Sequence, residues 1–508
     1  MTEQKNTPIG QMGAGAKQDI GGPVSAFHSS TNGTGNQAGK LDIDAIVKDG
    51  LDLRTPGDLL AEGAHDEGNA QCTHKLHRGR FAYNDALGWM HHTGTHWDTD
   101  GADQTVDRAI VDTLGKRIQA VFASGKPQQY DQLIKACVPN RSRVQGAKYL
   151  LTSLAAVSLA GFDADPDMLN CQNGVIDLRT GALTKHSTAQ RFTHCATVDY
   201  DPSADYCQWV SWLVDAVGEE LADWLQMAVG YSLTGHTREE ILFYLFGPPR
   251  AGKGLFSETL LALLSKPLAT SVNFGTFTAQ RTGDSQNFDL APLRPTRLVF
   301  ASESNAYERF NEAKVKALTG GDEIYCAFKH RSHFNYRPTF KIWLLSNQPV
   351  NADPDDDAVW ARVRLVHFPH SHLGNEDKGL KERMKEDANL RGVLAWAVEG
   401  ARRWYELGTA GLSEPASSRA LLAEHRGELD NVGAWLDECA TPDADGFCTS
   451  QNVYSSYKTW CDGIGVTPKQ QKGLTQSLER KGYTSTRMRV EGKVYRGFRG
   501  FSFTKRDT

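Results

Sequence analysis

A long apolar run that passes directly into a glycine-rich loop constrains the fold of this chain most strongly. The run ILFYLFG (241–247) is apolar up to its final glycine, which is typical of a strand buried on both faces of a sheet. The segment GLFSETLLALL (254–264) follows with helical spacing. Buried strands are also predicted in RLVFASES (297–304), TFKIWLLSN (339–347) and VRLVHF (363–368). Strands that alternate with helices predict an α/β fold around a sheet.

The loop GPPRAGKG (247–254) matches the Walker A pattern except at its last position. Gly247, Gly252 and Lys253 fit, but Gly254 replaces the Ser or Thr whose hydroxyl normally holds Mg²⁺. Backbone N–H groups at the start of the following helix can still bind phosphate, and Lys253 can place its charge on the β- and γ-phosphates. The predicted nucleotide-binding residues are Gly247, Pro248, Pro249, Arg250, Ala251, Gly252, Lys253 and Gly254.

Polar residues end the later strands. Glu303 closes one apolar run and can polarise an attacking water or help to hold Mg²⁺. Asn347 closes the next run and can orient that water, whereas Arg362 directly precedes the last run and Arg364 lies within it. Taken singly, these residues could be a helix cap, a turn residue and surface charges. Their order along one predicted sheet instead indicates an ATPase site.

The composition and net charge of the chain indicate that any nucleic-acid-binding surface is confined to one part of it. The chain has 508 residues and a net charge of -5, yet residues 451–508 hold twelve Lys and Arg against four Asp and Glu. No apolar run is long enough to span a membrane, and the nine cysteines form no CxxC pair, so a cytoplasmic protein with reduced thiols is expected. Cys72, His74 and His77 lack a fourth ligand at a zinc-like spacing, which favours a structural role over a metal site.

Changes in composition predict five segments. Residues 1–40 are polar and glycine-rich and are predicted to be a disordered arm. The remaining segments are a mixed α/β N-terminal domain (41–235), the α/β motor (236–412), a helical linker (413–440) and a small basic domain (441–508) with two helices and a two-strand wing that turns at Glu491-Gly492. Helices are also predicted at 107–122, 149–160, 219–235 and 390–408.

The chain resembles the superfamily-three helicases of phages, plasmids and large DNA viruses, and most of all the poxvirus-type primase-helicase C-terminal family. The motifs that carry the resemblance lie between about 170 and 370, with a weaker likeness to a winged-helix end over about 450–505. They are NGVIDLRTGAL, VDYDPSA, LQMAVGYSLTG, FGPPRAGKG, FDLAPLRPTRLVFASES, KALTGGDEI, RPTFKIWLLSNQP and DDDAVWARVRLVHF.

This resemblance implies an AAA+-like P-loop core that binds ATP and Mg²⁺ and assembles into a ring, usually a hexamer, around DNA. It implies that Glu303 is the Walker B carboxylate and Mg²⁺ residue, that Asn347 is the sensor, and that Arg362, with Arg364 second, reaches the neighbouring subunit's ATP. It also places a DNA-binding hairpin tip at Lys329, His330 and Arg331, for which a solvated turn is the alternative. A winged helix would contact DNA through Arg487, Arg489 and Lys493, or would dock a protein instead.

The expected function is an ATP-dependent DNA helicase in the replication of a phage, prophage or mobile element, acting in the host cytoplasm with a separate primase or polymerase. An ATP-binding origin-recognition or loading protein without processive unwinding is the alternative. The Gly-Lys-Gly sequence also occurs in adenylate-kinase-like loops, but a small-molecule kinase would not explain the arginine-bearing strand. No strand-borne pair of metal carboxylates precedes the motor, so primer synthesis by this chain is not expected.

Overall fold

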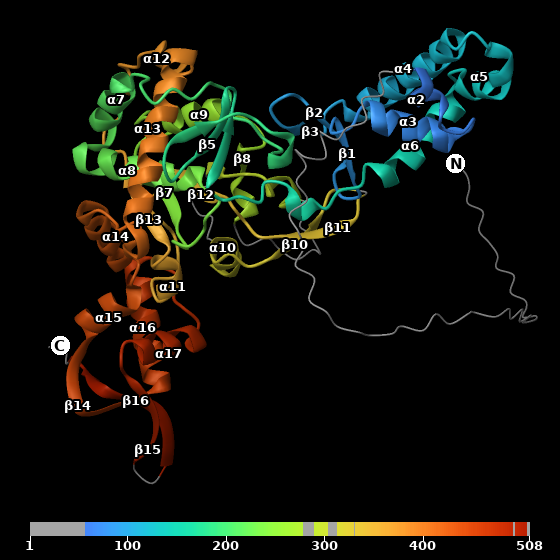
Figure 1. Ribbon diagram of the computed structural model, residues 1–508. Coiled ribbons are helices and arrows are strands. Elements are labelled where there is room, and N and C mark those ends of the chain that lie inside the picture. Colours follow the sequence, from blue (N-terminus) through green and yellow to red (C-terminus); the bar gives the residue numbers. More distant parts are fainter. Residues whose placement is uncertain (1–55, 278–288, 303–311, 330, 491–492, 505–508) are drawn as a thin grey trace, which may run out of the picture.

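The structure is a computed structural model that describes residues 56–277, 289–302, 312–329, 331–490 and 493–504. The predicted arm at 1–40 lies outside the described residues. Figure 1 shows a helical N-terminal unit at one end, a central body built on a sheet, and a C-terminal unit at the other end. No helix among the described residues is long and apolar enough to cross a membrane.

The N-terminal unit packs helices against a small antiparallel sheet of order β1-β2-β3. Its elements are α2 (Pro56–Leu60), α3 (Asp66–Leu76), β1 (Phe81–Asn84), β2 (Gly88–His92), β3 (Trp97–Asp98), α4 (Ala102–Ala123), α5 (Asp131–Cys137) and α6 (Arg141–Leu154). The predicted helix at 107–122 lies within α4, where Ile110, Leu114 and Val121 are buried. The helix predicted at 149–160 is only partly right, because α6 ends at Leu154 and a short 3-10 turn follows.

Short hairpins and two helices connect this unit to the central body. They are β4 (Met168–Cys171), β5 (Gly174–Asp177), β6 (Ala182–Thr184), α7 (Cys207–Val217) and α8 (Glu219–Leu233). The Asn-Gly sequence at 173–174 turns the chain between β4 and β5, where Cys171 pairs with Gly174. The short strands and the helix at 219–235 are therefore confirmed, with α8 ending two residues early.

The central body is built on a five-stranded parallel sheet of order β13-β7-β12-β9-β8. Its strands are β7 (Leu242–Phe246), β8 (Ala269–Asn273), β9 (Leu298–Ser302), β12 (Lys341–Ser346) and β13 (Val363–His367). Successive residues of β7 enter two different cores, with Phe243 in one and Tyr244 in the other. Both faces are buried, which explains the continuous apolar run that predicted this strand.

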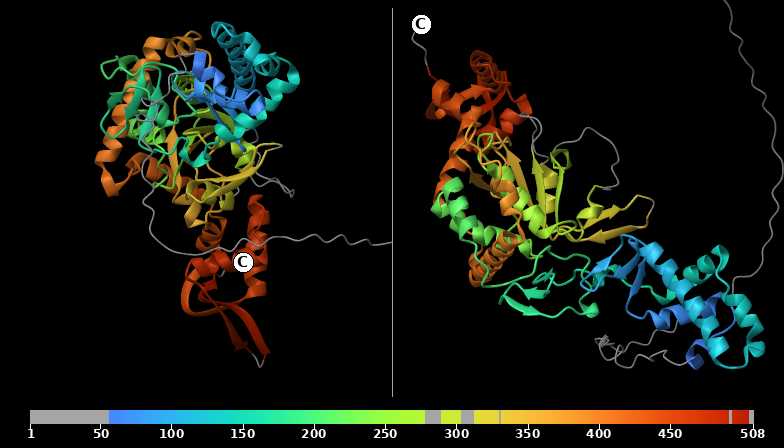
Figure 2. Two further views of the ribbon diagram at one scale, coloured as in Figure 1. Left: turned by 45° about the vertical axis from the view of Figure 1, so that its right-hand side comes forward. Right: turned by 90° about the horizontal axis from the view of Figure 1, so that it is seen from above.

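Helices cover both faces of this sheet (Figure 2). They are α9 (Lys253–Leu264), α10 (Glu312–Thr319), α11 (Asp357–Trp360), α12 (Leu380–Met384), α13 (Asp387–Glu406) and α14 (Ala416–Glu428). Trp343 of β12 is fully buried and stacks on Phe243 with ring centroids 4.0 Å apart. Such a pair adds about 0.5–1.5 kcal/mol beyond area burial. A separate antiparallel hairpin, β10 (Ile324–Ala327) with β11 (His333–Tyr336), extends from the body.

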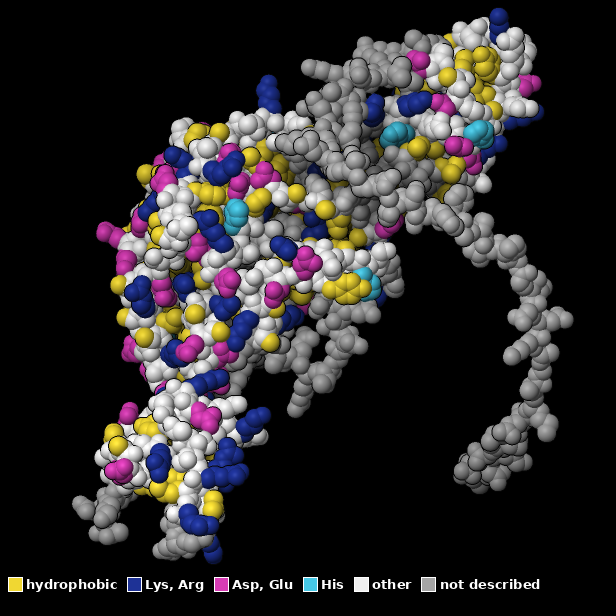
Figure 3. Space-filling view, turned by 60° about the horizontal axis from the view of Figure 1, so that its bottom comes forward, with side chains coloured by type: hydrophobic (Ala, Val, Ile, Leu, Met, Phe, Trp, Pro, Cys, Tyr) yellow, Lys and Arg dark blue, Asp and Glu magenta, His cyan; other side chains and the backbone are white. Residues whose placement is uncertain are grey.

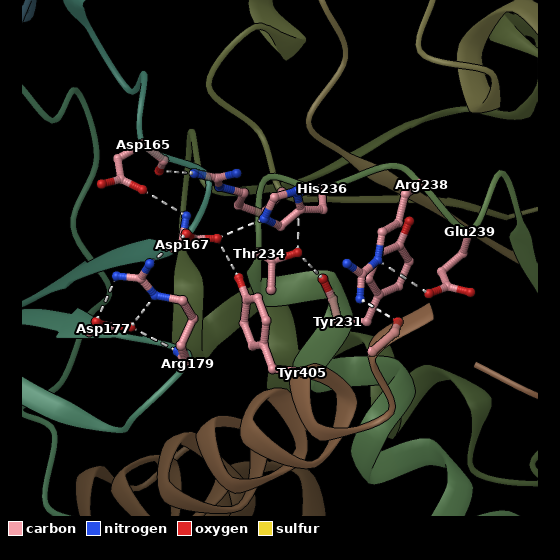
Figure 4. A network of polar contacts seen from close by, with 12 residues as sticks. Asp165, Asp167, Asp177, Arg179, Tyr231, Thr234, His236, Arg238, Glu239 and Tyr405 are labelled. Carbon is pink, nitrogen blue, oxygen red and sulfur yellow. Dashed lines mark hydrogen bonds and ion pairs between the residues drawn. The ribbon is translucent and has the colours of Figure 1, made fainter. Parts of the chain in front are cut away.

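A network of polar contacts lies at the end of the sheet where the parallel strands begin (Figure 4). The Oδ1 atom of Asp167 accepts a hydrogen bond from the Tyr405 hydroxyl at 2.6 Å, and the Nε2 atom of His236 lies 2.7 Å from the same oxygen. Lys341, the first residue of β12, donates its ammonium to the carbonyls of His236 and Thr339. These contacts join the β4–β6 region to α13 and to the start of β12.

The C-terminal unit has its own hydrophobic core. Its elements are α15 (Asn431–Cys439), β14 (Ala440–Thr449), α16 (Ser450–Ile464), α17 (Gln471–Arg480), β15 (Thr484–Val490) and β16 (Lys493–Phe503). The predicted two-strand pair is observed as β15 and β16, although its turn residues lie outside the described part of the chain. The sequence did not predict β14, which pairs with β16 as a third strand, and Trp435 of α15 is fully buried in this core.

Candidate nucleotide-binding site

The glycine-rich loop connects β7 to α9, as the sequence predicts. Gly247 has a φ of 149° and Gly252 a φ of 103°, values that favour glycine. A Cβ at Gly247 would lie 2.1 Å from the carbonyl oxygen of Phe368, so only glycine fits there. Gly252 is the N-cap of α9, so the N–H groups of the first turn of the helix border the loop. This arrangement can bind an anion such as phosphate.

Lys253 lies within the loop with its ammonium among oxygen atoms. The Nζ atom donates to the carbonyl oxygens of Gly247 at 2.6 Å and Pro248 at 2.9 Å, and to Oδ1 of Asn347 at 3.1 Å. The residue is 8% exposed, and burial lowers the pKa of its ammonium from the ordinary value. The structure therefore brings together two residues that the sequence assigned to one site from positions 94 apart.

The strand order explains this meeting. Asn347 directly follows β12, which lies beside β7, and Ser346 pairs with Phe246. Because the strands are parallel, their carboxyl ends meet at the edge where ligands bind in open α/β sheets. Strand β9 is the next neighbour and ends at Ser302 at the same edge. Glu303, the predicted catalytic carboxylate, comes directly after Ser302 and lies outside the described residues.

Space is open where the usual hydroxyl is missing. A Cβ built on Gly254 would meet only Oε1 of Glu258 and Nζ of Lys381, both at 3.8 Å, which is ordinary van der Waals contact. Lys381 and Lys385 hold the Glu258 carboxylate at 2.5 and 3.2 Å. The sequence analysis missed these lysines of α12 and its C-cap, which add positive charge beside the loop.

Gly254→Ser is expected to fold and to retain ATP binding. The new side chain has room, and exchanging glycine for serine inside a helix adds about 0.5 kcal/mol of stability. Its hydroxyl should lower the Mg²⁺ concentration needed for half-maximal ATPase activity, measured by Mg²⁺ titration. Gly252→Ser is the matched control and should lose ATP binding, because of its positive φ and the Trp212 ring atom 3.2 Å from the added Cβ. An unchanged Mg²⁺ dependence in Gly254→Ser would show that position 254 does not face the phosphates, and a loss of ATP binding equal to that of Gly252→Ser would contradict the expected room at position 254.

The segment after β13 encloses the loop from the other side. The hydroxyl of Ser371 donates to the carbonyl of Pro249 at 2.7 Å, and the N–H of His372 donates to the carbonyl of Arg250 at 3.2 Å. The ring of His367 stacks on Phe246 with centroids 5.0 Å apart. Burial, helped by the nearby charges of His425, His370 and Lys253, lowers the pKa of His367. No local motif marks these residues, so sequence reasoning missed them.

The predicted arginine fingers lie at the opposite end of β13. Arg362 precedes this strand, and its guanidinium contacts Oε2 of Glu240 at 2.9 Å and donates to the carbonyl of Ala358. Arg364 donates to the carbonyls of Ala361 and Val363, and burial lowers its pKa. Since the loop borders the far end of β13, neither arginine belongs to the phosphate site of its own chain. Their action on a neighbouring subunit stays a prediction.

The predicted DNA-contacting tip belongs to the β10–β11 hairpin. Lys329 and Arg331 lie between the two strands, whereas His330 is outside the described residues. Figure 2 shows this hairpin reaching towards the N-terminal unit. A Cβ on Gly88 of β2 would lie 2.7 Å from the Arg331 guanidinium, so the tip contacts that unit. The stem also carries a pair that the sequence analysis missed: Tyr325, 62% exposed, stacks on His333 with ring centroids 4.9 Å apart.

The predicted wing residues lie on one antiparallel pair of strands in the C-terminal unit. Arg487 and Arg489 are exposed on β15, and Lys493 is the exposed first residue of β16. Arg487 pairs directly with Arg496 across the strands. Like charges directly opposite one another are destabilising without an anion between them. Figure 3 shows lysine and arginine side chains gathered on this unit.

No group of three or more metal-ligating side chains occurs among the described residues. Cys72 is buried with its thiol 3.8 Å from the carbonyl of Leu59, and burial raises its pKa. Within the described ranges, Cys72, His74 and His77 therefore do not gather into a metal site.

Comparison with known proteins finds two family models on this chain. The model described as "D5 N terminal like" matches residues 70–218. A family of unknown function, DUF5906, matches residues 245–362, which include the loop, Asn347 and Arg362. Among solved structures, the C-terminal region of NrS-1 covers 66% of this chain and 95% of its own length, at 11% identity and a TM-score of 0.39.

Three similar proteins come from viruses. "Putative helicase L207/L206" of Acanthamoeba polyphaga mimivirus is 24% identical over 41% of this chain, and "Putative helicase 022R" of Frog virus 3 is 22% identical over 45%. "Putative helicase 121R" of Invertebrate iridescent virus 3 is 21% identical over 59%. The chain spans only 22%, 25% and 35% of the lengths of these relatives. The two family models and these relatives together show that the chain belongs to the phage and viral D5-like primase-helicase family.

Proposed function

We propose that this chain is the ATP-driven motor of a DNA helicase in phage or viral replication. The observation that carries the proposal is the meeting of Lys253 and Asn347 at the carboxyl end of a parallel sheet. A buried ammonium at the start of α9 and an amide directly after β12 suit a phosphate chain, with Lys253 on the phosphates and Asn347 on the attacking water. Names of relatives, family models and the strand order all support this reading.

The residues present fit a magnesium ion held mainly through oxygen atoms and water. Ser302 and Asn347 stand at the ends of neighbouring strands, and Glu303 follows Ser302 directly. Magnesium prefers such oxygen ligands and retains several waters, which accommodates the missing hydroxyl at position 254. When bound, the ion would neutralise charge on the phosphates. Glu303 would polarise the attacking water, while Lys253 and the loop N–H groups would orient the phosphate chain.

Lys253→Ala is expected to weaken ATP binding by about 30–5,000-fold, the cost of 2–5 kcal/mol typical of losing one partner of a desolvated charge pair. Glu303→Gln should retain ATP binding and lose hydrolysis, because it preserves the shape of the side chain but not its charge. Fluorescent-nucleotide binding and phosphate release separate the two effects. If Glu303→Gln hydrolysed ATP at the parental rate, the assignment of the catalytic carboxylate would be wrong.

Unwinding of a forked DNA by the parent chain tests the helicase activity itself. ATP hydrolysis stimulated by DNA without strand separation would favour the origin-recognition or loading alternative.

We also propose that the C-terminal unit is a winged helix that binds duplex DNA through the β15–β16 pair. Each phosphate contact should contribute about -0.9 to the slope of log K against log salt. Arg487→Gln with Arg489→Gln should therefore flatten the slope of the full chain by about 2, measured by fluorescence anisotropy. ATPase activity without DNA should not change. The control is Arg108→Gln with Arg141→Gln, which removes the same charge from two exposed arginines of the N-terminal unit. If this control flattened the salt dependence of DNA binding equally, a specific contact by the wing would be contradicted.

A further inference from the structure

An acidic segment of the central body, between β12 and β13, contacts the C-terminal unit. It comprises Asp353, Asp355, Asp356 and Asp357, which lie just before and at the start of α11. Two of its carboxylates bind the central body: Asp356 accepts from Lys316 of α10 at 2.7 Å, and Asp357 pairs with Arg426 of α14. The other two, Asp353 and Asp355, face the C-terminal unit.

Asp355 is held by three side chains of the C-terminal unit. Its Oδ2 atom lies 2.6 Å from Nζ of Lys469 and contacts the hydroxyl of Ser477, and its carbonyl oxygen accepts from Arg480 at 2.6 Å. Lys469 also reaches Oδ1 of Asp353 at 2.9 Å. The Asp355 side chain is 8% exposed. Burial opposes its ionised form, but Lys469 and Ser477 lower the pKa of this carboxyl overall.

These three side chains form a site for an oxyanion. Lys469 and Ser477 contact the carboxylate of Asp355, and Arg480 donates to the backbone carbonyl of the same residue. Lysine, arginine and serine side chains are groups that proteins use to bind DNA phosphates. They belong to α17 and the residues before it, within residues 451–508, which hold twelve Lys and Arg against four Asp and Glu. A carboxylate of the same chain takes the place that a phosphate would fill.

The acidic segment is positioned to be displaced. A hollow of about 400 Å³, lined in part by Asp355, Asp357, Arg426, Arg480 and Lys481, borders these contacts. Water and ions can therefore reach the pair of Lys469 with Asp353, whose side chains are 26% and 42% exposed, and such a pair contributes only about 0–1 kcal/mol. Asp355 is more buried, but several phosphates of one duplex, bound together with the β15–β16 arginines, can outcompete its contacts as well.

We propose that Lys469, Ser477 and Arg480 bind the phosphate backbone of duplex DNA, and that Asp353 and Asp355 occupy this site in competition with DNA. This inference rests on the proposed function only in taking DNA as the ligand. It requires neither ATP hydrolysis nor unwinding.

The test measures duplex affinity of the full chain without ATP, by fluorescence anisotropy at low salt. Asp353→Asn with Asp355→Asn should tighten binding on the order of tenfold, because the two carboxylates no longer compete with DNA for Lys469. Asp215→Asn with Glu424→Gln, exposed acids of α7 and α14, changes the net charge equally and should change affinity by less than about twofold.

A second pair of variants excludes a general charge effect. Lys469→Gln with Arg480→Gln should change the affinity of the parent little, because that site is already occupied, yet it should abolish the gain in the Asp353→Asn, Asp355→Asn background. If the aspartate variant keeps the parental melting temperature and binds DNA no more tightly than the control, the inference is overturned. It is also overturned if none of these chains binds duplex. Loss of ATPase or unwinding alone would instead count against the proposed motor function.

Discussion

Arg362→Ala is expected to lower the ATPase rate of the assembled protein by about 10³–10⁵-fold, the range for an arginine that stabilises transition-state charge from a neighbouring subunit. Its place supports this role. Arg362 lies at the end of β13 away from the loop, so it cannot serve the phosphates of its own chain. In the single chain, the Arg362 guanidinium pairs with Glu240. The Arg362 side chain is 20% exposed, so it lies near the surface.

Mixing the Arg362→Ala chain with a Lys253→Ala chain provides the positive test. Some interfaces in the mixed assembly would combine an intact loop with an intact arginine, so part of the ATPase activity should return. Glu240→Gln is the matched control, since it removes the partner of Arg362 and leaves the arginine in place. If the ion pair between Arg362 and Glu240 served only to stabilise the fold, Arg362→Ala and Glu240→Gln would lower the ATPase rate equally. No recovery in assemblies proven to be mixed would contradict action between subunits.

Asp163→Asn is expected to destabilise the protein by about 3–5 kcal/mol, the cost of leaving a buried charge without its partner. The Asp163 side chain is 5% exposed and contacts Arg294 at 3.0 Å, while Nδ1 of the fully buried His194 lies 3.1 Å away. It also accepts from the N–H and hydroxyl of Thr193 at 2.7 and 2.6 Å. Burial alone would raise the pKa of Asp163, but these partners hold it far below the ordinary value.

The sign of the pH dependence follows from this lowered pKa. The stability contributed by Asp163 is present above the pKa of the unfolded carboxyl, about 3.9, and is lost as the pH falls below it. Thermal unfolding near neutral pH should show a marked fall in Tm for Asp163→Asn. The parent and the variant should converge as the pH falls below about 4.

Asp199→Asn serves as the control for Asp163→Asn, because it breaks the half-exposed pair with Arg391 and should cost at most about 1 kcal/mol. Adding Arg294→Met to Asp163→Asn should cost less than the sum of the two single changes, since both buried charges are then gone. Additive losses would show that the two side chains do not act as a pair.

Strands buried on both faces were the easiest elements to predict. Runs such as those of β7 and β12 are apolar at every position because both faces meet a core. Strand β8 was missed because it lies at the edge of the sheet in the described part of the chain, beside β9, so its burial alternates and it has no continuous apolar run. Strand β14 was missed because its Pro442, aspartates and Gly446 are typical of turns, and an irregularity in its pairing accommodates them.

The sequence by itself determined the local units of this protein: the buried strand, the glycine loop, the helix after it, and the polar residues that end the neighbouring strands. Periodicity and turn chemistry depend on residues within a few positions of one another, so they can be read along the chain. Only the tertiary structure placed β12 beside β7, His367 on Phe246, and Lys469 between two aspartates more than 110 residues away. Such contacts depend on which elements pack together, and that choice is made by the whole core and strand order rather than by any local pattern.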